Sequence, residues 1–174
     1  MSEWFIESVL KTVGLKGPVG SNPTASSILK VKSVIDSFTG PNRFLSNFWP
    51  AKVMFEGEEY SSVEHAYVAA KTTDEEARKT IRGLTPGQAK RFGRSKIQLR
   101  EDWEDIKLHV MRELVSYKFF HNPDLSQLLL DTGDQELIEG NTWGDTYWGV
   151  CFDVGLNNLG KILMEIRSEL KNKS

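Results

Sequence analysis

The sequence predicts a single α+β domain that is predominantly α-helical, with a small β-hairpin and strand element and about six helices. The chain of 174 residues is long enough to bury a core without metal or disulfide cross-links. Strand-like alternation is confined to short segments between residues 34 and 60. Helical periodicity, with start and stop signals, recurs from residue 62 to residue 170 and therefore sets the fold class.

The β structure is expected at the start of the domain. Residues 34–38 can form a strand. Residues 51–60 alternate around Glu56 and Gly57 in the way that a short hairpin does. We therefore expect only a small amount of β structure.

Helices are expected after the hairpin. Pro86 occupies a favoured first-turn position, the pair Asn122-Pro123 ends a long helix, and Asp124 is expected to cap the next one. The predicted helical ranges are 62–72, 74–83, 86–94, 101–121, 125–130 and 159–170.

The first residues differ from the rest of the chain. Residues 4–13 have apolar side chains at helical spacing, and residues 17–23 are rich in glycine and proline. We therefore predict an N-terminal extension and linker over residues 1–33 and a folded domain over residues 34–171. Gly-Ser-Asn-Pro at residues 20–23 is also what the T-arm of a tRNA gene encodes in frame, so whether residues 1–33 are genuine coding sequence stays open.

Composition excludes several classes of protein. The chain is 39% hydrophobic and 26% charged, and no apolar run approaches the roughly 20 residues that cross a bilayer. The first residues lack the pattern of a secretory signal, so a cytoplasmic protein is expected. Cys151 is the only cysteine, and the three histidines lack metal-binding spacing, so neither a disulfide nor a bound metal is predicted.

Glu64 and His65 follow two serines at the expected start of a helix. The spacing from Ser61 to Glu64 is that of a capping box, and spacing alone favours this structural role. In the functional interpretation, a carboxylate at a helix start is held in place, and apolar neighbours raise its pKa into a range useful for catalysis. The residues alone do not choose between these two roles.

Residues 141–149 form a second cluster, with two tryptophans, a tyrosine, an acid and two glycines and no helical period. Tryptophan in a loop more often packs into the core, but an aromatic face that stacks on a base contributes roughly 1–3 kcal/mol. Asp145, between Trp143 and Trp148, strengthens the interpretation as a site for a planar ligand.

Four weaker signals accompany these clusters. Trp103 begins a helix whose apolar stripe explains it by packing. The turn at residues 155–160 precedes a helix whose first amides favour an anion, although such turns are more often only caps. Arg43 lies in a turn-rich segment, residues 40–48, that can hold a sugar or phosphate. Residues 77–100 contain eight Lys or Arg and no acid, which suits a surface that faces phosphates.

Five short motifs occur in one order along the chain. They are Phe44-Leu45-Ser46-Asn47-Phe48, Ser62-Val63-Glu64-His65, the segment 93–103 that ends in Glu101-Asp102-Trp103, Asp145-Thr146-Tyr147-Trp148-Gly149, and the segment 157–165 that begins Asn157-Asn158-Leu159-Gly160. With these motifs in this order, residues 34–171 resemble the NADAR family of YbiA-like N-glycosidases.

The resemblance implies a function and a set of site residues. Members of that family hydrolyse N-glycosidic bonds to ribose, in phosphoribosyl intermediates of riboflavin synthesis or in ADP-ribose attached to guanine, with no metal or redox cofactor. It implies a nucleotide substrate, including ADP-ribosylated DNA, and no membrane or obligate protein partner. The resemblance places the family's essential glutamate on Glu64, its helix-start tryptophan on Trp103 and its Asp-x-x-Trp pair on Asp145 and Trp148. We therefore predict Glu64 and Asp145 as catalytic residues and Trp103, Trp148, Asn47, Arg43, Asn157 and Tyr147 as substrate-binding residues.

Breaking a ribose C1′–N bond builds positive charge on the sugar, so the site needs an anion near C1′ and a base for water. We expect Glu64 to fill one of these roles, Asp145 to orient the ribose or exchange a proton, and Trp103 and Trp148 to sandwich a ring. The basic segment favours a nucleotide with two phosphates, or modified DNA. The alternatives are a non-catalytic module that binds ADP-ribose or NAD-like ligands and, against the net charge of −2, a DNA-binding accessory protein.

Overall fold

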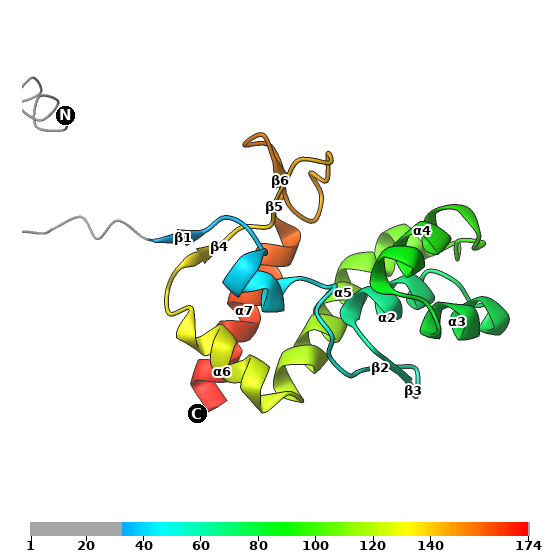
Figure 1. The fold of residues 1–174 in the computed structure, drawn as a ribbon, viewed down its shortest axis with the longest axis horizontal. Coiled ribbons are helices and arrows are strands. Elements are labelled where there is room, and N and C mark those ends of the chain that lie inside the picture. The colour runs from blue at the N-terminus through cyan, green and yellow to red at the C-terminus, as the bar shows by residue number, and fades with distance from the viewer. Residues whose placement is uncertain (1–32, 174) are drawn as a thin grey trace, which may run out of the picture. The chain divides into compact units, whose positions relative to one another are not determined.

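A computed structural model describes residues 33–173, which belong to one compact unit, Lys32–Ser174. The predicted extension, apart from residue 33, and the predicted helical segment at residues 4–13 lie outside the described residues. The elements are β1 (Val34–Ile35), the 3-10 helix η1 (Gly40–Leu45), β2 (Val53–Phe55), β3 (Glu58–Tyr60), α2 (Val63–Ala70), α3 (Glu75–Arg82), α4 (Pro86–Ser95), α5 (Trp103–Phe120), α6 (Pro123–Asp131), β4 (Glu136–Leu137), β5 (Gly140–Asn141), β6 (Val150–Cys151) and α7 (Asn158–Lys173) (Figure 1). The predicted α+β, predominantly helical fold is confirmed.

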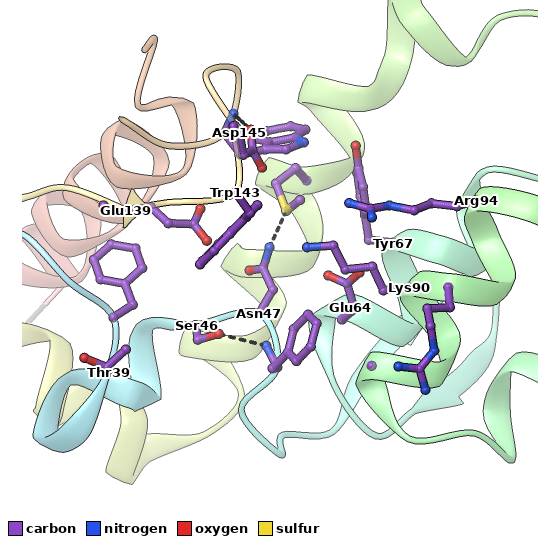
Figure 2. Close-up of a pocket in the computed structure, with 18 of the residues that line it drawn as sticks. Thr39, Ser46, Asn47, Glu64, Tyr67, Lys90, Arg94, Glu139, Trp143 and Asp145 are labelled. Atoms are coloured by element: carbon purple, nitrogen blue, oxygen red, sulfur yellow. Dashed lines mark hydrogen bonds between the residues drawn. The ribbon is translucent and has the colours of Figure 1, made fainter. Parts of the chain in front are cut away.

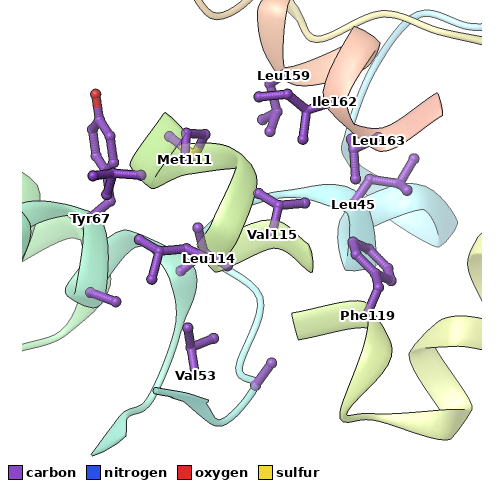
Figure 3. Close-up of a cluster of buried hydrophobic side chains, with 14 of the residues drawn as sticks. Leu45, Val53, Tyr67, Met111, Leu114, Val115, Phe119, Leu159, Ile162 and Leu163 are labelled. Carbon is purple, nitrogen blue, oxygen red and sulfur yellow. The ribbon is translucent and has the colours of Figure 1, made fainter. Parts of the chain in front are cut away.

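The longest helix, α5, runs through the middle of this unit (Figure 1). Helix α2 packs against one end of it, and α6 and α7 pack against the other part. The buried residues Met111, Leu114, Val115 and Phe119 recur along α5 at intervals of three and four, so they form one apolar face. Side chains from α2, η1 and α7 close over this face in the core (Figure 3). Within residues 33–173, no helix is both long and apolar enough to cross a membrane.

The strands form three separate pairs. β2 and β3 form the predicted antiparallel hairpin, and its turn residues Glu56 and Gly57 have φ angles of 47° and 83°, which a type I′ turn requires. β1 pairs in parallel with β4, and β5 pairs in parallel with β6. The strand predicted over residues 34–38 is only two residues long. β4, β5 and β6 were not predicted, because two residues are too few to show alternation.

The six α-helices of the described region match the predicted ranges closely. Helix α4 begins at Pro86, as predicted. Helix α6 begins at Pro123, directly after Asn122, so the prediction that Asp124 caps this helix is wrong. Proline is favoured at the first helical position because its missing N–H would have no partner there, and the helix therefore starts one residue earlier than the acid suggested.

The start of α2 differs from the predicted capping box. Ser62 is the N-cap, and its hydroxyl accepts a hydrogen bond from the amide of His65. The amide of Glu64 instead donates to the carbonyl oxygen of Asn47, at 3.0 Å. The His65 ring is buried, with Nδ1 2.7 Å from Ser62 Oγ and Nε2 2.8 Å from the carbonyl oxygen of Leu84. The cap is therefore made by Ser62 and His65, and Glu64 has no part in it.

Helices α2 and α4 pack closely at Gly93. A Cβ at this position would lie 2.6 Å from Val68 Cγ1, and Val68 is buried and stiff because it is β-branched. Alanine is favoured over glycine by about 1 kcal/mol in a helix interior, so a loss of stability in Gly93→Ala would report the packing alone. We expect Gly93→Ala to lower the free energy of unfolding by about 1–2 kcal/mol in urea denaturation, because overpacking outweighs helix propensity.

Gly83→Ala is the matched control for this prediction. Its nearest neighbour, the carbonyl oxygen of Thr80, would lie at an ordinary 3.6 Å from the new Cβ. Gly83 has φ −86°, which alanine adopts readily. The control should change stability by less than about 0.5 kcal/mol. Equal stability of the two variants would contradict the close packing of α2 and α4.

Candidate active site

A cavity of about 660 Å³ lies between the segment after η1, helices α2 and α4, and the loops that follow β4 and β5 (Figure 2). Cavities of roughly 300–1,000 Å³ are typical of small-molecule sites. Three carboxylates, four cations and several aromatic side chains line it. Its residues are Phe38, Thr39, Ser46, Asn47, Phe48, Glu64, Tyr67, Lys71, Gly87, Lys90, Arg91, Arg94, Met111, Glu139, Gly140, Trp143, Gly144, Asp145 and Trp148.

Glu64 lies in the wall of this cavity and is only 8% exposed. Burial raises the pKa of its carboxyl, while the nearby charges of Lys90, Lys71 and Arg94 oppose that rise and Asp145 adds to it. Its position in the first turn of α2 also favours an anion, because the helix dipole is positive there. Glu64 is therefore a desolvated carboxyl group, and three cations favour its ionised form against the effect of burial.

Asp145 also lines the cavity, and its carboxylate organises the surrounding loop. Its Oδ1 accepts hydrogen bonds from the amides of Tyr147 and Trp148, at 3.2 and 2.8 Å. The side chain of Asn141 bonds to the backbone of Asp145. Its Oδ1 accepts a hydrogen bond from the Asp145 amide at 3.0 Å, and its Nδ2 donates to the Asp145 carbonyl oxygen at 2.8 Å. Asp145 therefore shapes the loop that carries Trp148 and adds negative charge to the cavity.

Glu139 is a third carboxyl group of the cavity, and it was not predicted. It lies between β4 and β5, and its side chain points into the cavity (Figure 2). Its Oε2 is buried and has no hydrogen-bond partner among the described residues. Burial raises the pKa of Glu139 to about 7, with further increases from Asp145 and Glu64 and a decrease from Lys90. No periodicity or spacing in the sequence marks this residue, which stands two positions before the aromatic cluster.

Lys90, Arg91 and Arg94 project from α4 into the cavity wall, and Lys71 joins them from the end of α2. Burial lowers the pKa of Lys71. Of the basic segment at residues 77–100, the three bases of α4 line the cavity, and the expectation that the segment faces phosphates stays a prediction. Other bases of that segment pair with acids: Arg78 with Glu56, Arg82 with Glu58 and Arg100 with Asp102.

The aromatic side chains are arranged differently from the expected sandwich. Trp148 lines the cavity, whereas Trp103 is 4% exposed and does not line it. Tyr67 contacts both indoles, with ring centroids 5.0 Å from Trp103 and 5.6 Å from Trp148. The two tryptophans therefore do not enclose a free gap. Trp143, 61% exposed, lies at the rim with Lys90 Nζ 5.8 Å from its ring centroid.

Among the other predicted substrate-binding residues, Asn47 lines the cavity, and its Nδ2 donates to Met111 Sδ at 3.4 Å. Arg43 is exposed on η1 and does not line the cavity. Tyr147 also lies outside the cavity, and the Nζ of Lys107 is 4.2 Å from the centroid of its ring. The structure therefore brings Asn47, but neither Arg43 nor Tyr147, to Glu64.

Asn157 acts on the backbone rather than lining the cavity. Its Nδ2 donates to the carbonyl oxygen of Leu137 at 2.9 Å, and its Oδ1 accepts from the amide of Glu139 at 3.1 Å. The amides of residues 157–159 donate to the carbonyl oxygens of residues 147–149, so the anion site expected at the start of α7 is not present. Asn157 instead holds the segment from which Glu139 enters the cavity.

A helical domain with a carboxylate-lined, cation-walled cavity has the groups of an enzyme that acts on anionic small molecules. Residues 36–171 match the NADAR domain, so the chain belongs to the NADAR domain family. This match confirms the resemblance to the NADAR family that was inferred from the five sequence motifs.

Three relatives are similar over most of the domain. N-glycosidase Npun_R5314 of Nostoc punctiforme is 38% identical over 138 residues, which are 76% of this chain and 88% of that protein. N-glycosidase YbiA of Escherichia coli is 41% identical over 130 residues, 72% of this chain and 79% of that protein. The Riboflavin biosynthesis protein VVA0006 of Vibrio vulnificus is 42% identical over 131 residues, 74% of this chain but only 35% of that longer protein.

The fold agrees with a solved structure from the same family. The NMR structure of the E. coli protein YbiA superposes with a TM-score of 0.70 and 32% sequence identity. The superposition covers 83% of this chain and 91% of the other. The arrangement of helices around α5 is therefore shared with YbiA.

The raised pKa of Glu139 predicts how stability depends on pH. In the unfolded chain this carboxyl loses its proton near pH 4.5, whereas in the folded protein it keeps the proton up to about pH 7. Its contribution to stability is therefore complete below pH 4.5 and is lost as the pH rises from about 4.5 to about 7. Glu139→Gln keeps a neutral side chain and should remove this loss.

We expect Glu139→Gln to match the wild type in urea denaturation at pH 4.5 and to exceed it at pH 8 by on the order of 2 kcal/mol. Glu101→Gln, at an exposed position, is the control and should follow the wild type at both pH values. Parallel curves for the wild type and Glu139→Gln would mean that Glu139 has the same pKa in the folded and the unfolded chain, which would contradict the raised pKa.

Proposed function

We propose that this protein is an N-glycosidase that hydrolyses the bond between ribose C1′ and a nitrogen atom of the base in a phosphate-bearing nucleotide derivative. The observation that carries this proposal is the buried carboxylate of Glu64 in a cavity whose α4 wall is cationic. An anion near C1′ stabilises the positive charge that develops on the sugar, and cations bind phosphate oxygens. The names of the relatives, N-glycosidases in two of the three cases, support the same activity.

In this reaction Glu64 acts on the sugar side. It accepts a proton from water as the water oxygen forms a bond to C1′, and its negative charge stabilises the oxocarbenium-like transition state. The C1′–N bond breaks at the same time, and its electron pair leaves with the base, which must gain a proton. Asn47, beside Glu64 and bonded to Met111, is placed to orient the ribose.

Two groups of substrates fit this chemistry. The name of the relative VVA0006 supports a phosphoribosylaminopyrimidine intermediate of riboflavin synthesis. The three cations of α4 also suit the two phosphates of ADP-ribose attached to guanine, free or in DNA. In either case the phosphate lies against α4 and the base extends toward Trp143 and Trp148.

Glu64→Gln should greatly reduce turnover and leave the fold intact, because the amide cannot accept the water proton. We expect kcat to fall by at least about 10²–10⁴ with little change in melting temperature or in substrate affinity. The assay incubates the protein with phosphoribosylaminopyrimidines, ADP-ribosylated guanine in DNA, NAD and ADP-ribose, and detects released base and sugar by mass spectrometry. If the wild type binds one of these compounds and returns it unchanged, the protein is a binding module and the proposed activity is wrong.

Arg91→Gln tests the assignment of the phosphate to α4. Losing one charge-assisted hydrogen bond costs about 1.5–3 kcal/mol, so we expect KM to rise roughly 10- to 100-fold with a nearly unchanged kcat. The same variant should barely affect binding of the dephosphorylated nucleoside. Lys96→Gln, which removes an exposed charge from the end of α4 outside the cavity, is the matched control and should leave KM unchanged. Equal effects of both variants would point to a general electrostatic field instead of a phosphate contact.

A further inference from the structure

Glu139 is built into the cavity on a rigid backbone. Its amide donates to Asn157 Oδ1 at 3.1 Å, and its carbonyl oxygen accepts from the amide of Val150 at 2.9 Å. A Cβ at Gly149 would lie only 2.1 Å from the same carbonyl oxygen, so the glycine permits this close approach. The backbone on both sides of the Glu139 side chain is therefore fixed, and the carboxyl group enters the cavity from a defined position.

The carboxyl group of Glu139 is in a place where a carboxylate is unfavourable. Its Oε2 is buried without a hydrogen-bond partner among residues 33–173, and an unpaired buried charge is costly. The charged groups that face it are Lys90 from α4, Glu64 from α2 and Asp145 from the loop after β5. Two of these three are acids, so the surroundings favour the protonated form.

Burial raises the pKa of Glu64 as well, but more cations oppose that rise at Glu64 than at Glu139. Lys90, Lys71 and Arg94 all favour its ionised form, whereas Lys90 alone does so for Glu139. Figure 2 shows the two side chains entering the cavity from different elements, Glu64 from α2 and Glu139 from the segment before β5. Two carboxyl groups in one cavity that differ in the number of cations around them can divide the roles of acid and base.

We propose that Glu139 donates the proton that the departing base must gain, while Glu64 remains the anion on the sugar side. This inference rests on the proposed N-glycosidase function and names the second catalytic residue of the same site. Asn157 is a positioning residue for it, because its side chain holds the Glu139 amide.

The proton and electron balance of the step is complete without another reactant. As the C1′–N bond breaks, its electron pair goes to the leaving nitrogen, and the Glu139 carboxyl gives that nitrogen its proton. Water adds its oxygen to C1′ and gives one proton to Glu64. The products are free ribose phosphate and the neutral base, with Glu139 ionised and Glu64 protonated. A proton exchange with solvent returns both groups to their starting states.

The protonation state of Glu139 can be measured without any substrate. In protein labelled with 13C at the glutamate carboxyl carbons, the resonance that disappears in Glu139→Gln belongs to Glu139. We expect this resonance to keep the chemical shift of a protonated carboxyl at pH 6. A resonance already at its ionised position at pH 5 would overturn the proposal.

The catalytic role is tested by the leaving group. Against a phosphoribosylaminopyrimidine, Glu139→Gln should lose about 10²–10⁴ in kcat, because the amine leaves poorly without a proton. Against 7-methylguanosine 5′-monophosphate, whose base leaves neutral without needing one, the loss should be under about tenfold. Glu64→Gln should lose activity on both compounds. Equal losses for both compounds in Glu139→Gln would overturn the assignment of Glu139 as proton donor.

The same assays separate this inference from the proposed function. A wild type that cleaves no ribose–nitrogen bond refutes the function, and with it the role of Glu139. An active wild type together with an equally active Glu139→Gln refutes only the role of Glu139. The melting temperature of the variant, measured in parallel, identifies any loss that comes from misfolding.

Discussion

The burial of one carboxyl group, that of Glu64, is the constraint on which the arrangement of the rest of the site depends. A desolvated carboxylate is unfavourable unless charges or dipoles offset the loss of water. Helix α2 supplies its N-terminal dipole, and Lys71, Lys90 and Arg94 supply cations from α2 and α4. Charged side chains from both α2 and α4 lie near Glu64. The close approach of these two helices at Gly93 therefore helps to place the cations beside the Glu64 carboxyl group.

The opposite wall of the cavity is held by side-chain amides that bond to the backbone. The Asn141 side chain bonds to both the amide and the carbonyl oxygen of Asp145. The Asn157 side chain, at the start of α7, bonds to the carbonyl oxygen of Leu137 and to the amide of Glu139. β4, β5 and β6 have only two residues each, so their own ladders supply few hydrogen bonds. The asparagine side chains supply the additional hydrogen bonds that hold these segments in place. A cavity that must place carboxyl groups accurately thus rests on short strands fixed by asparagine.

The helices and the hairpin could be predicted from the sequence, because periodicity, proline and turn residues act over a few positions. The placement of Glu64 in a cavity with Asp145 and Trp148 also followed from the family motifs. The roles of the other site residues depend on contacts between segments that are far apart in the sequence, which local patterns do not show. Trp103 and Asn157 carry the right chemistry for a ligand, but Tyr67 covers the first and the backbone uses the second. Glu139 is an ordinary acid in the sequence, and only the fold removes its hydrogen-bond partners.

The most direct test of the account is a crystal structure of Glu64→Gln with an intact phosphoribosylated substrate. We predict that C1′ lies about 3–3.5 Å from a water held by the substituted side chain, with the phosphate against α4 and the leaving nitrogen within hydrogen-bond reach of Glu139. A ligand whose ribose lies away from residue 64, or whose phosphate contacts none of Lys90, Arg91 and Arg94, would contradict this prediction.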